Sequence, residues 1–205
     1  MAKDLSNASA PTPTLAAEKE KSHYFQKFKV KDIVYLAIMS AVAMVTCAVM
    51  PLVVPYLTVI FGIAQLVTGL QECLFVTIGA CKVRKPGSVL IMTLCIALLQ
   101  LAMSTVMFFV TLVCGIVVEL LFYFIHAYDS PVKLASIIGL FTPLSLPFNF
   151  LYNLWFGSDM MVHVAERSVG LTIGMTFAVL AVSYLGAFLG MKIYKELKKA
   201  GAIKN

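Results

Sequence analysis

The chain has 205 residues, of which 60% are hydrophobic and 13% are charged. A chain of this size has too little interior to hide so much apolar surface from water, which excludes a soluble enzyme, a disordered chain and a disulfide-stapled secreted domain. Its apolar runs are long and unbroken, whereas the strands of a membrane β-barrel alternate apolar and polar residues. The sequence therefore predicts an all-α integral membrane protein.

The net charge of +6 is unevenly distributed along the chain. Six lysines precede the first apolar run and five follow the last one. Basic residues that flank apolar segments are typical of the cytoplasmic side of membrane proteins. No basic groove with interleaved aromatic residues is indicated, so we interpret this charge as a membrane-orientation signal and not as nucleic-acid binding.

Residues 1–31 are polar and rich in Ala, Ser and Pro, which predicts a partly disordered cytoplasmic tail. A six-helix membrane domain is expected over residues 32–196, and residues 197–205 are expected to form a second cytoplasmic tail. The six predicted spans cover residues 32–54, 55–81, 87–104, 107–128, 134–155 and 169–194.

The second predicted span is longer than the roughly 20 residues needed to cross a bilayer. We therefore expect one crossing that is bent or broken near Thr68 and Gly69, with a re-entrant segment as an open alternative. Pro143 and Pro147 interrupt the fifth predicted span. Because these prolines have no counterpart in the second span, the sequence shows no internal repeat of two three-helix halves.

An even number of crossings places both termini on the same side of the membrane. The basic turns at residues 82–85 and at Lys133 then face that side too, whereas Arg167 is the one Lys or Arg in the turns on the other side. Charge and hydropathy together predict that both termini are cytoplasmic.

Small residues four positions apart occur in the first and last spans. Ala37 and Ala41 form an Ala-x-x-x-Ala pattern, and Gly186 and Gly190 form a Gly-x-x-x-Gly pattern. Residues at this spacing share a helix face, and small side chains let another helix approach closely. That helix belongs either to the same bundle or to a partner membrane protein.

Glu119 lies near the middle of the fourth predicted span, where a charged group is costly. It is either a hydrogen-bonded structural acid or a proton or ion site. Glu72 is expected nearer the inner surface.

Polar and aromatic residues gather at the outer ends of the third, fifth and sixth predicted spans. Asn149, Tyr152 and Asn153 are spaced three or four residues apart, so they share a helix face. They form either an aromatic belt with internal amide pairs, or a binding pocket for a flat, polar ligand. The predicted pocket residues are Gln100, Asn149, Tyr152, Asn153, Trp155 and Arg167, and the Arg167 cation could hold an anionic ligand group.

The sequence contains no catalytic-nucleophile motif, no zinc-binding motif and no nucleotide-binding loop. Its five cysteines all fall in apolar segments without a short Cys-x-x-Cys spacing, so we interpret them as packing residues. We therefore expect no enzymatic activity, no cofactor and no metal site, and any ATP energy must come from another chain.

Three short segments of this chain resemble a known group of membrane proteins. They are residues 28–33 (FKVKDI), 81–87 (CKVRKPG) and 115–120 (GIVVEL), and they accompany the pattern of Ala37 and Ala41. Together with six predicted spans in about 200 residues, they resemble the substrate-binding S components of energy-coupling factor (ECF) transporters. The similarity is to the Trep_Strep branch, in which an acid occupies the place of Glu119.

The resemblance implies a multi-pass protein of the bacterial cell membrane that captures a vitamin-like micronutrient on the outside. Such a subunit of an ABC importer docks on a coupling transmembrane subunit that carries two ATPase subunits, and it topples in the membrane to deliver its substrate. Ala37 and Ala41 correspond to the docking motif of the family, whereas the binding residues do not correspond by motif. The alternative is a stand-alone small carrier or channel, coupled to protons or ions through Glu119.

Overall fold

The computed structural model describes residues 28–47, 61–156 and 169–201 of the chain. All regular structure in these ranges is helical. The elements are α2 (Val30–Thr46), α3 (Ile63–Val83), α4 (Ser88–Leu101), α5 (Thr105–Ile125), the 3-10 helix η3 (Ala127–Asp129), α6 (Pro131–Ile138), α7 (Phe141–Phe156) and α9 (Val169–Lys199). The all-α prediction is therefore confirmed for the part of the chain that the structure describes.

Four helical segments of the described ranges are long and apolar enough to cross a membrane. They are Ile63–Val83, Thr105–Ile125, Pro131–Phe156 and Val169–Lys199, while Ser88–Leu101 is apolar but shorter. Six crossings, the orientation of the termini and the two tails stay predictions. Residues 1–27 and 202–205 lie outside the described residues, and α9 extends three residues into the predicted second tail.

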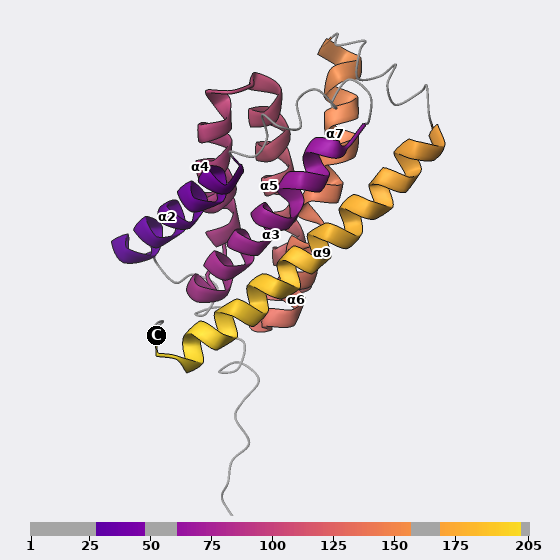
Figure 1. Cartoon of the computed structure of the whole chain (residues 1–205). Coiled ribbons are helices and arrows are strands. Elements are labelled where there is room, and N and C mark those ends of the chain that lie inside the picture. The colour runs from indigo at the N-terminus through magenta and orange to yellow at the C-terminus, as the bar shows by residue number, and fades with distance from the viewer. Residues whose placement is uncertain (1–27, 48–60, 157–168, 202–205) are drawn as a thin grey trace, which may run out of the picture.

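Helix α3 lies at the centre of the bundle, where it contacts α2, α4, α6, α7 and α9. Its most extensive neighbour is α9, which runs beside it along much of its length (Figure 1). A Cβ atom added at Gly186 would lie 2.4 Å from the carbonyl oxygen of Leu70, and one at Gly190 would lie 2.5 Å from that of Leu74. The Gly-x-x-x-Gly pattern therefore packs two helices of the same bundle against each other.

A tight turn joins α3 to α4. Arg84 ends α3 in the left-handed region with φ of 43°, and Gly87 precedes α4 with φ of 91°. Glycine adopts that conformation without steric cost, which explains its use where the chain reverses.

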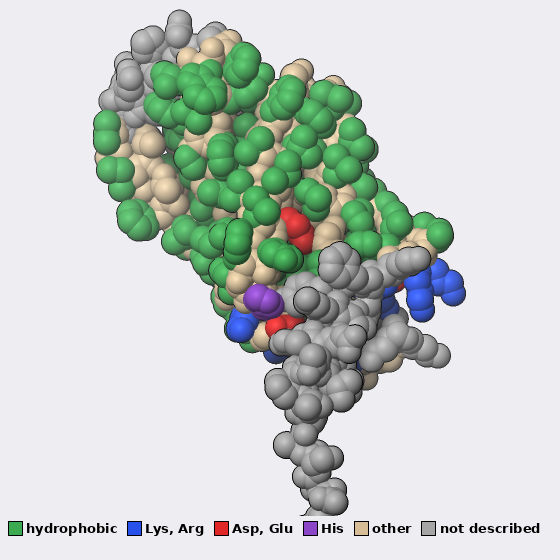
Figure 2. All heavy atoms as spheres, turned by 180° about the vertical axis from the view of Figure 1, so that it is seen from behind, with side chains coloured by type: hydrophobic (Ala, Val, Ile, Leu, Met, Phe, Trp, Pro, Cys, Tyr) green, Lys and Arg blue, Asp and Glu red, His purple; other side chains and the backbone are tan. Residues whose placement is uncertain are grey.

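Lysine and arginine side chains gather at one end of the bundle, where α3, α5 and α9 finish and where α4 and α6 begin. Figure 2 shows this end below a long face covered by hydrophobic side chains. We call it the basic end. Exposed apolar residues such as Phe124 and Phe177, 73% and 68% exposed, are what a surface in contact with lipid requires.

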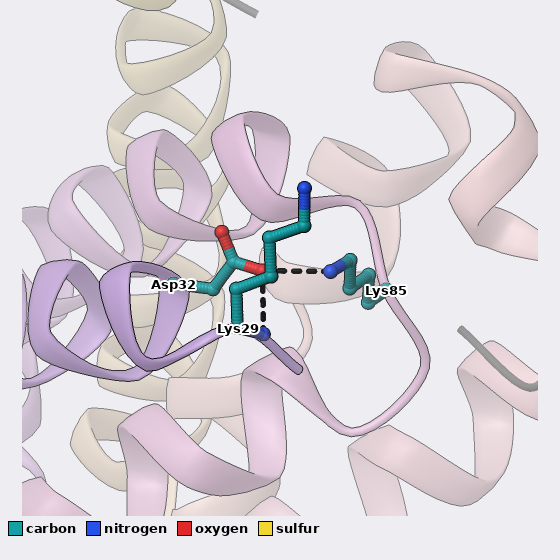
Figure 3. A network of polar contacts seen from close by, with 3 residues as sticks. All are labelled: Lys29, Asp32 and Lys85. Carbon is teal, nitrogen blue, oxygen red and sulfur yellow. Dashed lines mark hydrogen bonds and ion pairs between the residues drawn. The ribbon is translucent and has the colours of Figure 1, made fainter. Parts of the chain in front are cut away.

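An ion pair ties the start of α2 to the basic end. The Lys85 ammonium lies 2.6 Å from a carboxylate oxygen of Asp32, and the backbone N–H of Lys29 donates to the same oxygen at 3.2 Å (Figure 3). Asp32 thus satisfies a free donor at the helix start while it contacts the turn after α3.

The structure corrects two expected interruptions. Helix α3 runs unbroken through Thr68 and Gly69, so the break predicted there is wrong. The fifth predicted span does divide, but at residues 139–140, between α6 and α7. Pro143 consequently occupies the first turn of α7, where a missing N–H costs no intrahelical hydrogen bond, and Pro147 lies inside the helix.

Candidate functional site: a polar cavity in the half of the bundle away from the basic end

A cavity of about 380 Å³ lies in the half of the bundle away from the basic end. This volume falls in the range of small-molecule sites, roughly 300–1,000 Å³. Helices α2, α3, α4, α5 and α7 all contribute to its wall. The lining residues are Met44, Cys47, Ala64, Gln65, Thr68, Glu72, Gln100, Met103, Met107, Val110, Thr111, Phe141, Thr142, Ser145 and Asn149.

Glu72 is the acidic residue among the described lining residues, and it is 7% exposed near the middle of α3. The Gln100 side-chain amide donates a hydrogen bond to its carboxylate oxygen Oε1 at 3.3 Å. The Thr111 hydroxyl in turn donates to the Gln100 amide oxygen at 2.5 Å. The hydrogen bonds therefore run from Thr111 to Gln100 and from Gln100 to Glu72, which accepts at its Oε1 atom.

Two hydroxyl groups of the lining donate to their own helices. The Thr68 hydroxyl donates to the Ala64 carbonyl at 3.0 Å, and the Ser145 hydroxyl donates to the Thr142 carbonyl at 2.6 Å. Each hydroxyl oxygen keeps acceptor capacity after its proton is used. Gln65, Thr68 and Glu72 are spaced three and four residues apart, so they form a polar stripe on one face of α3.

The structure divides the predicted pocket residues. Gln100 and Asn149 line the cavity. Asn153 is 6% exposed, and its amide donates to the Asn149 carbonyl and side-chain oxygens at 2.7 and 2.6 Å. Asn153 therefore orients the Asn149 side chain through a hydrogen bond, and it is not among the described residues that line the cavity. Arg167 lies outside the described residues.

Tyr152 and Trp155 line a separate apolar groove of about 470 Å³ between α5 and α7. The Tyr152 ring stacks on Phe156 with centroids 4.8 Å apart, and Trp155 is 72% exposed. Tyr152 and Trp155 are not among the described residues that line the cavity with Asn149, although Val110 borders both the cavity and the groove. An exposed aromatic cluster of this kind fits a lipid-facing belt.

Glu119 lies away from the cavity and caps the start of α4. Its carboxylate accepts the backbone N–H of Gly87 at 2.6 Å and that of Leu90 at 3.2 Å. The Tyr128 hydroxyl donates to both oxygens at 2.9 and 3.0 Å, and burial raises the pKa of this phenol, which keeps its proton in place. Helix N-termini favour a negative charge, so these contacts favour the structural interpretation of Glu119.

Ala37 and Ala41 lie on α2, half-buried and exposed respectively. Large apolar residues around them also face outward, namely Val34, Ile38 and Val45, which are 50%, 56% and 73% exposed. Small side chains in an exposed apolar surface let another helix approach closely. Their role in docking stays a prediction.

Glu72 is missing from the predicted pocket residues, yet it lines the cavity as the tenth residue of α3. Its expected place nearer the inner surface stays a prediction. The signal that could have found this lining residue is the spacing of Gln65, Thr68 and Glu72 on one face of a mostly apolar helix.

Comparisons with known proteins agree with this architecture. A family model described as "Hypothetical bacterial integral membrane protein (Trep_Strep)" matches residues 30–199. The chain is also similar to a crystal structure of an S-component of an ECF transporter, with a TM-score of 0.56 and 22% identity over 86% of this chain and 89% of that chain. A search of curated proteins found no match. The predicted resemblance is thereby confirmed, and the chain belongs to the Trep_Strep family of bacterial integral membrane proteins.

Proposed function

We propose that this protein is the membrane-embedded substrate-binding subunit of an ECF-type importer for a vitamin-like micronutrient. One observation carries the proposal: a bundle with the fold of an S-component encloses a cavity with a buried polar wall. A cavity lined by amides, hydroxyls and one acid, with an apolar remainder, is typical of a site that orients a small molecule.

The orientation of the proposed subunit follows from its charges. The positive-inside rule puts the basic end in the cytoplasm of a bacterial cell, so the cavity lies in the outer half of the membrane, where an importer meets its substrate. Both termini are then cytoplasmic after six crossings.

The energy for import comes from separate ATPase subunits, because the sequence has no nucleotide-binding motif. The exposed apolar surface around Ala37 and Ala41 is the proposed contact with the coupling transmembrane subunit.

The deciding experiment has two stages. The purified chain is denatured, and the small molecules that it releases are identified by mass spectrometry. Uptake of the released compound is then measured in vesicles that hold the chain alone, or the chain with its coupling subunit and ATPases. The proposal expects ATP-dependent uptake in the complete assembly only. Uptake by the chain alone would support the stand-alone carrier instead.

The orientation has its own test. Lys133 at the basic end and Thr105 at the start of α5 are both exposed. Single cysteines at these positions in a cysteine-free background should react with impermeant reagents from the inside and the outside respectively. Reaction of both from one side would contradict six crossings and the proposed orientation.

A further inference from the structure

We propose that the ligand of this cavity is an organic cation whose positively charged nitrogen lies against Glu72. This inference rests on the proposed function and adds the chemical class of the substrate. It differs from the sequence-based expectation, in which Arg167 offered a counter-charge to an anionic ligand.

The first observation is the charge of the wall. Among the described lining residues, Glu72 is the one Asp, Glu, Lys, Arg or His side chain, so a charged group in this part of the wall can only be negative. The positive charges of the described ranges lie at the basic end, on the other half of the bundle. Residues 48–60, outside the described ranges, contain no Lys or Arg in their sequence.

The second observation is how little the scaffold compensates Glu72. Within the described residues, its carboxylate receives one hydrogen bond, from the Gln100 amide, and it makes no ion pair. A buried carboxylate with one neutral partner is costly, because the lost hydration is only partly replaced. A cation bound in the cavity would supply the missing compensation.

The third observation is the direction of the hydrogen bonds around the cavity. Thr68 and Ser145 donate their protons to backbone carbonyls, and Thr111 donates to Gln100. The Asn149 side-chain oxygen already accepts from Asn153. The hydroxyl oxygens of Thr68 and Ser145, together with the Glu72 carboxylate, therefore present acceptors to a ligand. Such a wall suits a molecule with several N–H donors, as a protonated amine or amidine has.

The fourth observation concerns size. A bare metal ion would leave most of about 380 Å³ empty, and the described residues contain no group of three or more His, Cys, Asp or Glu side chains suited to a metal. Met44, Met103, Met107 and Phe141 give the rest of the wall a soft, polarizable surface against which an apolar ring can pack. The cavity thus fits a compact organic molecule with one charged end.

The test uses the full-length protein in detergent as wild type, Glu72→Gln and Glu196→Gln. The last is the same chemical change at an exposed residue of α9, outside the cavity. Molecules released on denaturation are identified by mass spectrometry. Two matched probe series, the aminomethyl, hydroxymethyl and carboxylate derivatives of pyridine and of indole, are compared by thermal shift and by titration calorimetry.

The expected result has three parts. The wild type and Glu196→Gln release a molecule that is a cation at pH 7, and Glu72→Gln retains at least tenfold less of it. Any probe that binds the wild type is an aminomethyl derivative that loses affinity in Glu72→Gln. The thermal stability of ligand-free Glu72→Gln equals or exceeds that of the wild type, because a neutral amide is cheaper to bury.

Other results overturn the inference. One is a released molecule that is anionic or neutral, or that Glu72→Gln retains at the wild-type level. Another is a loss of ligand-free stability in Glu72→Gln, which would show an internal counter-charge for Glu72 such as Arg167. If the wild type releases no small molecule and none of the probes changes its unfolding temperature, the proposed function itself fails. That outcome is distinct from binding of the wrong charge class.

Discussion

The two halves of the bundle use the same small residues differently. Towards the basic end, Gly186 and Gly190 of α9 sit so close to α3 that even a methyl group would meet a carbonyl oxygen. In the opposite half, an added Cβ at Gly170 or Gly174 of the same helix would meet no atom of the described residues within 4 Å. The buried residues of α9 all lie from Val179 onward. One half is thus tightly packed, while the other contains the cavity and leaves the start of α9 exposed (Figure 1).

The two acids within the apolar region show the same contrast. Glu119 accepts two backbone N–H groups and the Tyr128 hydroxyl, so the scaffold satisfies it. Glu72 accepts one side-chain amide within the described residues and faces a cavity. Glu119 thus receives more hydrogen bonds from the protein than Glu72 does. We infer that Glu119 stabilises the fold and that Glu72 is available to a ligand. Changes at Glu119 test this distinction, whereas changes at Gly186, Asn149 and Ala41 test the packing, the cavity and the outer surface of the bundle.

The largest expected effect is on stability and follows from removing the Glu119 carboxylate. Glu119→Ala leaves the N–H groups of Gly87 and Leu90 and the hydroxyl of Tyr128 without their acceptor. We expect a loss of about 2–4 kcal/mol in the free energy of unfolding, since each buried donor without a partner costs about 1–3 kcal/mol. Thermal unfolding in detergent should show a midpoint lowered by roughly 5–15 °C.

Glu119→Gln keeps one acceptor oxygen and should lose less stability than Glu119→Ala. A stable Glu119→Ala protein whose ATP-independent transport is abolished would show instead that Glu119 is a proton or ion site.

The next effect compares two glycines of α9. Gly186→Ala should lower the free energy of unfolding by about 1–3 kcal/mol, because the new methyl group would lie against the Leu70 carbonyl and force the helices apart. Gly174→Ala is the matched control in open space and should be neutral or slightly stabilising, since alanine is the better helix former. Equal effects of the two changes would contradict the difference in packing between the halves.

The fold class could be predicted from the sequence, but the helix boundaries could not. Unbroken apolar runs and flanking lysines identify a helical membrane protein because both follow from the cost of polar groups in lipid. Gly62 precedes α3 and Gly139 follows α6. A single glycine in an apolar run does not by itself fix a helix boundary, because the boundary also depends on how neighbouring helices pack. Pro143 lies close to the helix break but is not part of it, because proline is tolerated in the first turn of a helix.

The site could be predicted only in part for a related reason. Polar residues at span ends pointed to Gln100 and Asn149, both of which line the cavity. Spacing alone does not say which side of a helix faces a cavity, so Tyr152 was grouped with Asn149 although it lines the apolar groove. Glu72 is absent from the predicted pocket residues, because the spacing of polar residues in α3 does not show that this face of the helix borders a cavity.

A smaller effect concerns ligand affinity. Asn149→Ala should weaken binding of the released compound by roughly tenfold, the loss of one hydrogen bond to a buried group. Asn153→Ala should weaken it less, because Asn153 acts by orienting the Asn149 amide. Trp155→Leu, in the apolar groove, is the control and should leave affinity unchanged. Calorimetry on the three variants measures these differences. Unchanged affinity in Asn149→Ala with a large loss of ligand-free stability would mean that the amides hold the bundle together.

The smallest effect on the isolated chain is expected at the outer face of α2. Ala41 is exposed, so Ala41→Trp places a bulky ring outside the bundle and should change the free energy of unfolding by less than about 0.5 kcal/mol. Ligand binding should also be unchanged, because the cavity wall does not include this residue.

Copurification with the coupling subunit should nevertheless fall sharply, since a large side chain keeps a partner helix away. Leu120→Trp, at a residue of α5 that is 52% exposed, provides the control for a bulky ring on another lipid-facing helix. If Ala41→Trp copurifies as well as Leu120→Trp and the wild type, the docking surface lies elsewhere on the bundle.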